Sequence, residues 1–327
     1  MRTLFNRRGA LAATALGLPA LASAQGTAAW PRQAIRFVIP FAPGGTSEIV
    51  GRTLAQELSK QLGQTVFVDN KGGGAGIPAM TEVAKSAPDG HTLIMGHVGS
   101  LAVQPYIFNN LSYDVAKDFI PVTMIARVPN LFAIHPDVPA RDFKEFVAYA
   151  KKNPGKLDYG SAGNASAGHL AMEYLKMVTG MFITHIPYRG TGPMLTDLLA
   201  GRTQATSAGL PALLPQIKAG KLRAIAVGTA QRLANLPEVP TVAEMGFKDF
   251  ETSQWYGILV PAGTPREIVR RLQEETVKAL KSNSVTARFT NDGAFGGGAT
   301  PEEFSAFIGQ QQKTWKAIIE RASIKPD

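Results

Sequence analysis

The chain contains no cysteine. This absence excludes disulfide bonds, thiol catalysis and cysteine metal sites, so stability in an oxidising compartment must come from the hydrophobic core alone. Histidine is scarce as well, and the five histidines show no metal-ligand spacing: they are His91, His97, His135, His169 and His185. The sequence therefore predicts no metal site.

Nucleotide-binding signatures are lacking too. No G-x-x-x-x-G-K-[ST] segment occurs, so the phosphate-binding loop of nucleoside triphosphate enzymes is missing. The segment Gly74-Ala75-Gly76-Ile77-Pro78-Ala79 fits the dinucleotide pattern G-x-G-x-x-A, but it follows the second expected strand instead of the first and contains a proline. No acidic residue closes the next strand. We therefore expect no dinucleotide and no other cofactor.

Long hydrophobic runs are confined to the N-terminus. Residues 1–24 combine three arginines with an apolar run at 10–22 and the small-x-small sequence Ala22-Ser23-Ala24, which is typical of a secretory signal peptide. No later segment offers the roughly 18 uninterrupted apolar residues of a membrane span. We predict export to the periplasm with cleavage after Ala24. The pair Arg7-Arg8 leaves the general secretory and twin-arginine routes both open.

Charge of one sign is not concentrated anywhere in the chain. The formal charge of +9 falls to +6 when Arg2, Arg7 and Arg8 are removed with the signal peptide. The remaining lysines and arginines are scattered, and no block alternates basic with aromatic residues, so nucleic-acid binding is not favoured. A mildly positive field would nevertheless help to recruit small anions.

The 327 residues are enough for two α/β domains, and 45% hydrophobic residues is ordinary for a globular protein. Strands are expected at 36–40, 65–69 and 92–96, with helices at 49–62 and 77–86 between them. This βαβαβ alternation predicts a parallel sheet with helices on its faces.

Two extended segments should connect the domains. Residues 120–134, interrupted by Pro121 and Pro129, are expected to cross into the second domain, and residues 253–260 to carry the chain back. The boundaries that we predict are 1–24 for the signal peptide, 25–127 with 253–327 for domain 1, and 128–252 for domain 2. Between and after the crossings we expect helices at 143–152, 265–281 and 301–322, and strands at 157–160, 184–188, 204–208 and 222–227.

Three strand–turn–helix segments form the candidate ligand site: residues 35–62, 157–180 and 185–199. In the first, Thr46 or Ser47 is expected to cap the helix, and Gly45 should provide close backbone access. A helix start that follows such a turn presents unpaired N–H groups at the positive end of the macrodipole, which is a ready anion site. In open α/β sheets, ligands lie beyond the carboxyl ends of the strands, where these turns gather.

Enzyme motifs are weak by comparison. Ser161 with His169 suggests a hydrolase, but Gly160-Ser161-Ala162-Gly163 is not a G-x-S-x-G elbow. His169 fits a helix-start residue that bonds its own loop better than a catalytic base. Arg189 has the chemistry of a carboxylate clamp, although an arginine beside a turn more often faces solvent. We expect no enzyme.

Seven motifs, in this order, resemble those of the Bug, or TctC-like, family of extracytoplasmic solute receptors: PFAPGG at 40–45, YDVAKDF at 113–119, NPGKL at 153–157, GSAG at 160–163, PYRG at 187–190, LPEVPT at 236–241 and PAGTP at 261–265. The resemblance covers residues 30–322. It implies a periplasmic-binding-protein fold of the second type, with two α/β lobes, a ligand cleft and two interdomain crossovers.

The resemblance also implies a function: capture of a small carboxylated molecule for a tripartite tricarboxylate-type transporter, by a protein that we expect to be a monomer. A sensory receptor that docks on a membrane sensor is the main alternative, and an exported hydrolase is a remote one. Glu48, Arg189 and Gln204 replace the residues that are usual in the family, so the ligand's identity stays open. The expected ligand-binding residues are Ala42, Gly44, Gly45, Thr46, Ser47, Ser100, Ser161, Gly163, Asn164, Ser166, His169 and Tyr188.

Overall fold

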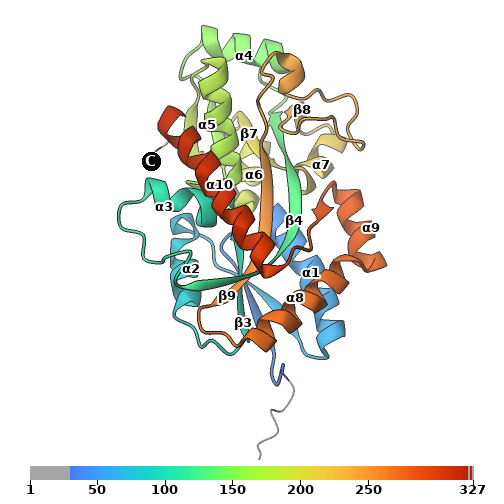
Figure 1. Ribbon diagram of the computed structural model, residues 1–327. Coiled ribbons are helices and arrows are strands. Elements are labelled where there is room, and N and C mark those ends of the chain that lie inside the picture. Colours follow the sequence, from blue (N-terminus) through green and yellow to red (C-terminus); the bar gives the residue numbers. More distant parts are fainter. Residues whose placement is uncertain (1–29, 323–324, 326–327) are drawn as a thin grey trace, which may run out of the picture. The chain divides into compact units, whose positions relative to one another are not determined.

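The computed structural model describes residues 30–322 and residue 325 (Figure 1). The predicted signal peptide and its cleavage site lie outside the described residues. Residues from Pro31 onward form one compact unit, and the description that follows concerns this unit. Among the described helices, none has the length and apolar character needed to cross a membrane.

The strands of this unit join in the order β2-β1-β3-β9-β4-β7-β5-β6, and β8 and β10 also pair with β4. Strand β4 (Phe119–Ile134) is shared between two groups of strands. Its first part, as far as Pro129, pairs with β9 (Ser253–Pro261), whereas Asn130–Ile134 pair with β7 (Ala205–Gly209). The long ribbons of β4 and β9 therefore connect two α/β lobes, as Figure 1 shows.

The first lobe is built around parallel pairs of β1 with β2 and with β3, and β3 pairs antiparallel with β9. One face of this sheet packs against helix α1, whose Gly51 lies against Ile39 and Met95. The other face is a cluster that includes Val38, Ile94 and Phe304. The elements of this lobe besides β4 and β9 are β1 (Ile35–Ile39), α1 (Thr46–Leu62), β2 (Val66–Asn70), η1 (Gly74–Gly76), α2 (Ile77–Ala84), β3 (Thr92–His97), the π-helix η2 (Gly99–Val103), α3 (Gln104–Ile107), α8 (Arg266–Leu280), α9 (Asn283–Asp292), β10 (Phe295–Gly296) and α10 (Pro301–Ala322).

The second lobe has the same layered construction. Adjacent residues of β4 point to opposite faces, as strand geometry requires, so Leu131 and Phe132 belong to two different hydrophobic clusters. Strand β5 pairs in parallel with β6 and β7. The elements of this lobe are α4 (Phe143–Lys152), β5 (Asp158–Ser161), α5 (Ala167–Thr179), β6 (Thr184–Pro187), α6 (Thr191–Leu199), β7 (Ala205–Gly209), α7 (Leu210–Lys218), β8 (Arg223–Val227) and η3 (Ala243–Met245).

The C-terminal helix α10 is a further connection between the lobes. It packs against η2 and β4 and also contacts α5 of the second lobe. In Figure 1 this red helix runs diagonally across the front of the molecule. Its aromatic residues enter the core of the first lobe, because Phe304 and Trp315 are both buried there.

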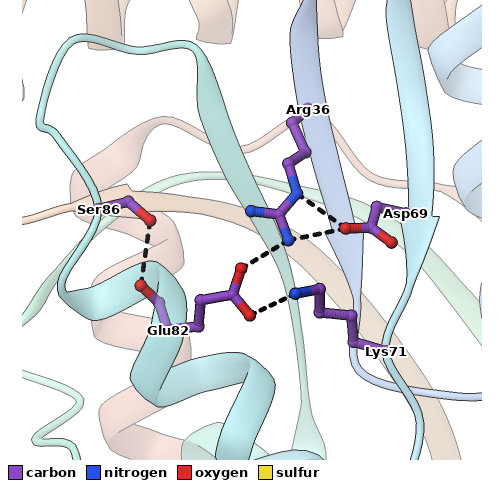
Figure 2. A network of polar contacts seen from close by, with 5 residues as sticks. All are labelled: Arg36, Asp69, Lys71, Glu82 and Ser86. Atoms are coloured by element: carbon purple, nitrogen blue, oxygen red, sulfur yellow. Dashed lines mark hydrogen bonds and ion pairs between the residues drawn. The ribbon is translucent and has the colours of Figure 1, made fainter.

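A polar network fastens the edge of the first lobe's sheet (Figure 2). Arg36 on β1 bonds Asp69 on β2 at 2.7 Å and Glu82 on α2 at 2.7 Å, and Lys71 forms a second ion pair with Glu82. Ser86 donates a hydrogen bond to the backbone carbonyl oxygen of Glu82. The bonds from Lys71 and then Arg36 hold the pKa of Glu82 below its usual value. The network thus adds polar links between β1, the end of β2 and α2 to the hydrophobic cluster that β1 and α2 share.

The predicted fold class is confirmed, and most of the expected elements appear within a few residues of their predicted bounds. Helix α1 begins three residues before the predicted start at 49. Helix α7 has no counterpart in the prediction. It contains Pro211 at its start and Pro215 in its interior, and a proline removes a donor and normally ends a helix.

Candidate functional site

A small cavity lies where the two lobes meet. Half of its wall comes from each lobe. The first lobe contributes Phe41, Ser47, His97, Val98, Gln254, Trp255 and Tyr256, and the second contributes Ala162, Ser166, Ala167, Gly168, Thr191, Ser207 and Ala208. The strand–turn–helix segments expected from the sequence all contribute residues to this wall.

The start of α1 supplies the first group of donors. The N-cap is Gly45, with extended φ of −111° and no side-chain cap, so the expectation that Thr46 or Ser47 caps the helix is wrong. Thr46 and Ser47 are instead the first two helical residues, and N–H groups at these positions have no acceptor within the helix. Ser47 lines the cavity, while the Thr46 hydroxyl reaches the Gly209 carbonyl oxygen of the other lobe at 3.4 Å.

Two expected ligand donors at this turn are already engaged within the protein. The Ala42 N–H donates to the Arg189 carbonyl oxygen at 2.9 Å, and the Gly44 N–H donates to the Glu48 carboxylate at 2.6 Å. Glu48 also accepts from Arg52. Glu48 therefore closes the turn onto its own helix, and its carboxylate is absent from the cavity wall among the described residues.

The second group of donors is the start of α5. Ser166 is the N-cap, and its side chain accepts from the His169 N–H at 3.3 Å. The next two residues, Ala167 and Gly168, line the cavity, and their backbone N–H groups have no acceptor within the helix. Gly168 lies so close to Ser207 that a Cβ would stand 1.9 Å from the Ser207 carbonyl oxygen. Only glycine therefore fits at this contact between α5 and β7.

The residues before α5 shape its turn. The Ser161 hydroxyl accepts from the Gly163 N–H at 3.0 Å and lies 2.6 Å from Nε2 of His185. Gly163 has a φ of +116°, which favours glycine, and a Cβ there would stand 2.8 Å from the Tyr188 carbonyl oxygen. Asn164 completes the same turn. Ser161, Gly163 and Asn164 are not among the described wall residues, although Ala162 beside them is.

Helix α6 supplies a third start at the cavity. Its N-cap is Gly190, and Thr191, the first helical residue, lines the wall. Tyr188 lies nearby but donates its hydroxyl to Asp197 at 2.8 Å. Burial, assisted by Asp197, raises the pKa of Tyr188 to about 12. The structure thus places Tyr188 beside the site with its hydroxyl engaged within the second lobe.

Two further expected site residues, His169 and Ser100, lie behind the wall. His169 is buried, its Nδ1 accepts from the Ala165 N–H at 3.2 Å, and its ring stacks on His185 with centroids 4.3 Å apart. Burial lowers the pKa of His169 to about 3, with the charges of His185 and Lys176 acting in the same direction. The Ser100 hydroxyl bonds the backbone of His97. Both residues support the residues in front of them.

Sequence reasoning missed the wall that β3, β7 and β9 provide. His97 ends β3, Ser207 lies in β7, and Gln254 with Tyr256 lies in β9. His97 could have been predicted from the sequence, because it ends an expected strand and ligands bind at the carboxyl ends of strands. Ser207 and Gln254 carried none, since each stands inside a strand and only the meeting of the lobes brings it to the cavity.

The electrostatics of the cavity come from neutral groups. None of its described wall residues carries a formal charge, so the positive potential comes from the starts of α1, α5 and α6. Gln254 donates to the Asn130 side chain at 2.9 Å and accepts from the Tyr256 hydroxyl. Burial lowers the pKa of His97 to about 3, which keeps its ring neutral. The arrangement can hold an anion by hydrogen bonds and helix dipoles.

Comparisons with known proteins agree with this geometry. The family described as tripartite tricarboxylate transporter family receptor matches residues 50–324. Protein BugT of Bordetella pertussis is 34% identical over 90% of this chain and 91% of its own. No charged wall residue and no metal cluster is found among the described residues.

Two solved structures are similar over almost the whole described chain. Rpa4515 of R. palustris, solved with adipate, is 38% identical, has a TM-score of 0.89, and covers 91% of this chain and 100% of its own. MatC (Rpa3494) from Rhodopseudomonas palustris, solved with bound malate, is 31% identical, has a TM-score of 0.85, and covers 89% of this chain and 100% of its own. The chain belongs to the tripartite tricarboxylate transporter family of receptors, and its fold is that of a periplasmic binding protein of the second type.

Proposed function

We propose that this chain captures a small carboxylate between its two lobes and presents it to a tripartite tricarboxylate-type transporter in the membrane. The observation that carries the proposal is the convergence of three helix starts on one uncharged cavity. Backbone N–H groups at a helix start stabilise a carboxylate by hydrogen bonds and by the helix dipole. The adipate and malate seen in the two solved relatives are carboxylates and support the same chemistry.

The contacts between the lobes support a receptor that opens and closes. The Ala42 N–H bonds the Arg189 carbonyl oxygen, and the Thr46 hydroxyl bonds the Gly209 carbonyl oxygen, each across the cleft. These contacts hold the two lobes together at the cleft, and they break when the lobes move apart. We propose hinges where β4 changes partners after Pro129 and where the chain returns into β9, close to the predicted domain boundaries at 127 and 252.

Several further features belong to the same proposal. The protein acts after export to the periplasm and removal of residues 1–24, it functions as a monomer, and it performs no chemistry of its own. Membership of a family of transporter receptors supports this binding role.

A thermal-shift screen tests the proposal. The protein is unfolded, freed of bound ligand, refolded and mixed with a panel of organic acids, amines and sugars. A true ligand at 100 times its dissociation constant stabilises the folded protein by about 2.7 kcal/mol. We expect one or more carboxylates to raise the unfolding temperature and the amines and sugars to leave it unchanged. A panel in which only amines or sugars stabilise the protein would contradict carboxylate capture.

A further inference from the structure

His185 lies behind the turn that leads into α5 and is not among the described residues of the cavity wall. It belongs to β6, opposite Tyr159 in the parallel pairing with β5. Its ring is stacked between those of Tyr159 and His169, with centroids 4.8 and 4.3 Å apart. Its Nε2 lies 2.6 Å from the hydroxyl oxygen of Ser161, the last residue of β5. Stacking on both faces therefore holds the ring in place to act on Ser161.

Residues 161–166 form the turn between β5 and α5, which we call the α5 turn. It contains two residues in the left-handed region, Gly163 with a φ of +116° and Ala165 with a φ of +59°. An alanine in this region is strained, and it stays there only where surrounding contacts hold it. The same turn meets the first lobe, because a Cβ built on Gly99 would stand 2.1 Å from the Ala165 carbonyl oxygen. The α5 turn therefore needs contacts that fix its backbone.

Two stacked histidines provide such contacts from behind the turn. The hydroxyl that His185 contacts, on Ser161, accepts the N–H of Gly163 at 3.0 Å. Nδ1 of His169 accepts the N–H of Ala165 at 3.2 Å. Ser161 is fully buried, so solvent does not replace His185 as a partner of its hydroxyl. The stack thus holds both left-handed residues of the α5 turn.

A serine and a histidine this close resemble the nucleophile and general base of a hydrolase. Ser161 has no exposed surface, however, and its hydroxyl already accepts the Gly163 N–H. The hydroxyl is closed off from a substrate in the cavity. The pair is therefore suited to orienting the backbone and not to catalysis.

We propose that His185 is a positioning residue for ligand capture: through Ser161 it holds the α5 turn in the shape in which the N–H groups at the start of α5 can meet a carboxylate. This inference rests on the proposed function, which assigns the ligand carboxylate to the helix starts. Ala162 in the turn and Ala167 and Gly168 after it line the cavity. A change in the turn therefore moves part of the wall together with the first N–H groups of α5. Because hydrogen bonds weaken steeply away from a straight geometry, such a shift costs affinity.

Two substitutions of similar side-chain length separate the hydrogen bond of His185 from its stacking. His185→Gln and His185→Met both remove the ring, but the glutamine amide can still bond the Ser161 hydroxyl, whereas a thioether is only a weak acceptor. The probes are acetate, succinate, malate and adipate, and isothermal titration calorimetry measures their affinities. We expect His185→Met to bind the tightest probe about 5- to 30-fold more weakly than the parent, which is the effect of one hydrogen bond. His185→Gln should stay within about threefold of the parent.

Tyr159→Phe is the matched control, because it keeps its ring in the same stack and removes a hydrogen bond that does not reach the α5 turn, the one from the Tyr159 hydroxyl to Glu173. It should leave all affinities unchanged. A double variant with Ser161→Ala and His185→Met should bind no more weakly than His185→Met alone, because the two side chains act as one unit. A further loss in the double variant would mean that Ser161 acts on the ligand without His185.

Amide hydrogen exchange measures the α5 turn itself, without any ligand. The Gly163 N–H should exchange slowly in the ligand-free parent and in Tyr159→Phe, and at least about fivefold faster in His185→Met. The parent measurement covers the case in which His185→Met does not fold. The inference is overturned if His185→Gln and His185→Met bind the probe alike, or if the Gly163 N–H of the ligand-free parent exchanges as fast as an exposed amide. If no probe binds the parent protein, the proposed function falls, and the exchange rates still decide whether His185 holds the turn.

Discussion

Gly192 offers a way to block closure of the receptor without touching the ligand. It is the second residue of α6, where alanine is well tolerated, and its φ lies outside the left-handed region. A Cβ built on Gly192 would stand 2.1 Å from the Pro43 carbonyl oxygen of the other lobe. Ordinary contacts of this kind begin near 3.4 Å, so Gly192→Ala must part the lobes by more than 1 Å at this point.

That displacement disrupts the contacts across the cleft. The bond from the Ala42 N–H to the Arg189 carbonyl oxygen, now 2.9 Å long, would be lost together with part of the ligand's own contacts. One or two lost hydrogen bonds cost about 1–3 kcal/mol, so Gly192→Ala should weaken ligand binding by about 10- to 100-fold. Calorimetry measures this change, and small-angle scattering should show that the ligand compacts the variant less than the parent.

The matched control is Gly309→Ala in α10, because a Cβ there meets no atom within 4 Å. This substitution should leave affinity and compaction unchanged and slightly raise helix stability. The ligand-free Gly192→Ala protein should unfold at the parent's temperature, since the clash exists only when the lobes are closed. If Gly192→Ala binds the ligand as tightly as the parent protein does, the arrangement of the lobes in this structure is not the ligand-bound one.

Three further predictions concern processing and stability. If residues 1–24 are a signal peptide, the intact mass of the exported protein should correspond to a chain beginning at Gln25, and recovery of only the full-length chain would disprove export by cleavage. His97 and His169, with pKa values lowered to about 3 by burial, bind protons only after unfolding as pH falls below about 6.5. The unfolded state then holds more protons than the folded state. Chemical denaturation should therefore show the free energy of unfolding falling between pH 6.5 and 4, by up to about 1.4 kcal/mol per pH unit for each histidine. A free energy of unfolding that does not change over this pH range would contradict two buried neutral rings. Glu82→Gln should destabilise the protein at pH 7 by no more than about 1 kcal/mol, because the ion pairs of Glu82 are partly exposed. This destabilisation should vanish as pH falls through the lowered pKa of Glu82, and an equal destabilisation at pH 3 would point to packing instead.

Local patterns were enough to predict most of the fold and the starts of the site helices. The glycines of the turn after β1 predict the start of α1, and the spacing of the apolar residues Val50, Leu54 and Leu58 predicts its buried face. Local rules failed at α7, where Pro215 sits inside a helix that its packing on β4 and β7 stabilises. Tertiary contacts there outweigh the loss of one backbone hydrogen bond.

The candidate site was predictable only where it is local. Ser47 and Ser166 line the cavity, and each belongs to a helix start that sequence patterns reveal; that they bind the ligand stays a prediction. Ala42 and Gly44 were expected to meet the ligand directly, yet their N–H groups bond Arg189 and Glu48. Whether such an N–H group stays free for a ligand depends on acceptors that are distant in the sequence or on the conformation of a nearby side chain. Neither can be predicted from the spacing of residues in the sequence.

The most direct test of carboxylate capture by helix starts is a crystal structure of the ligand-bound protein. The account predicts a ligand carboxylate in the cavity between the lobes, with its oxygens within hydrogen-bond distance of N–H groups at the starts of α1 and α5, those of Ser47 and Gly168 among them. A carboxylate held instead by a lysine or arginine side chain, or a ligand bound outside this cavity, would contradict it.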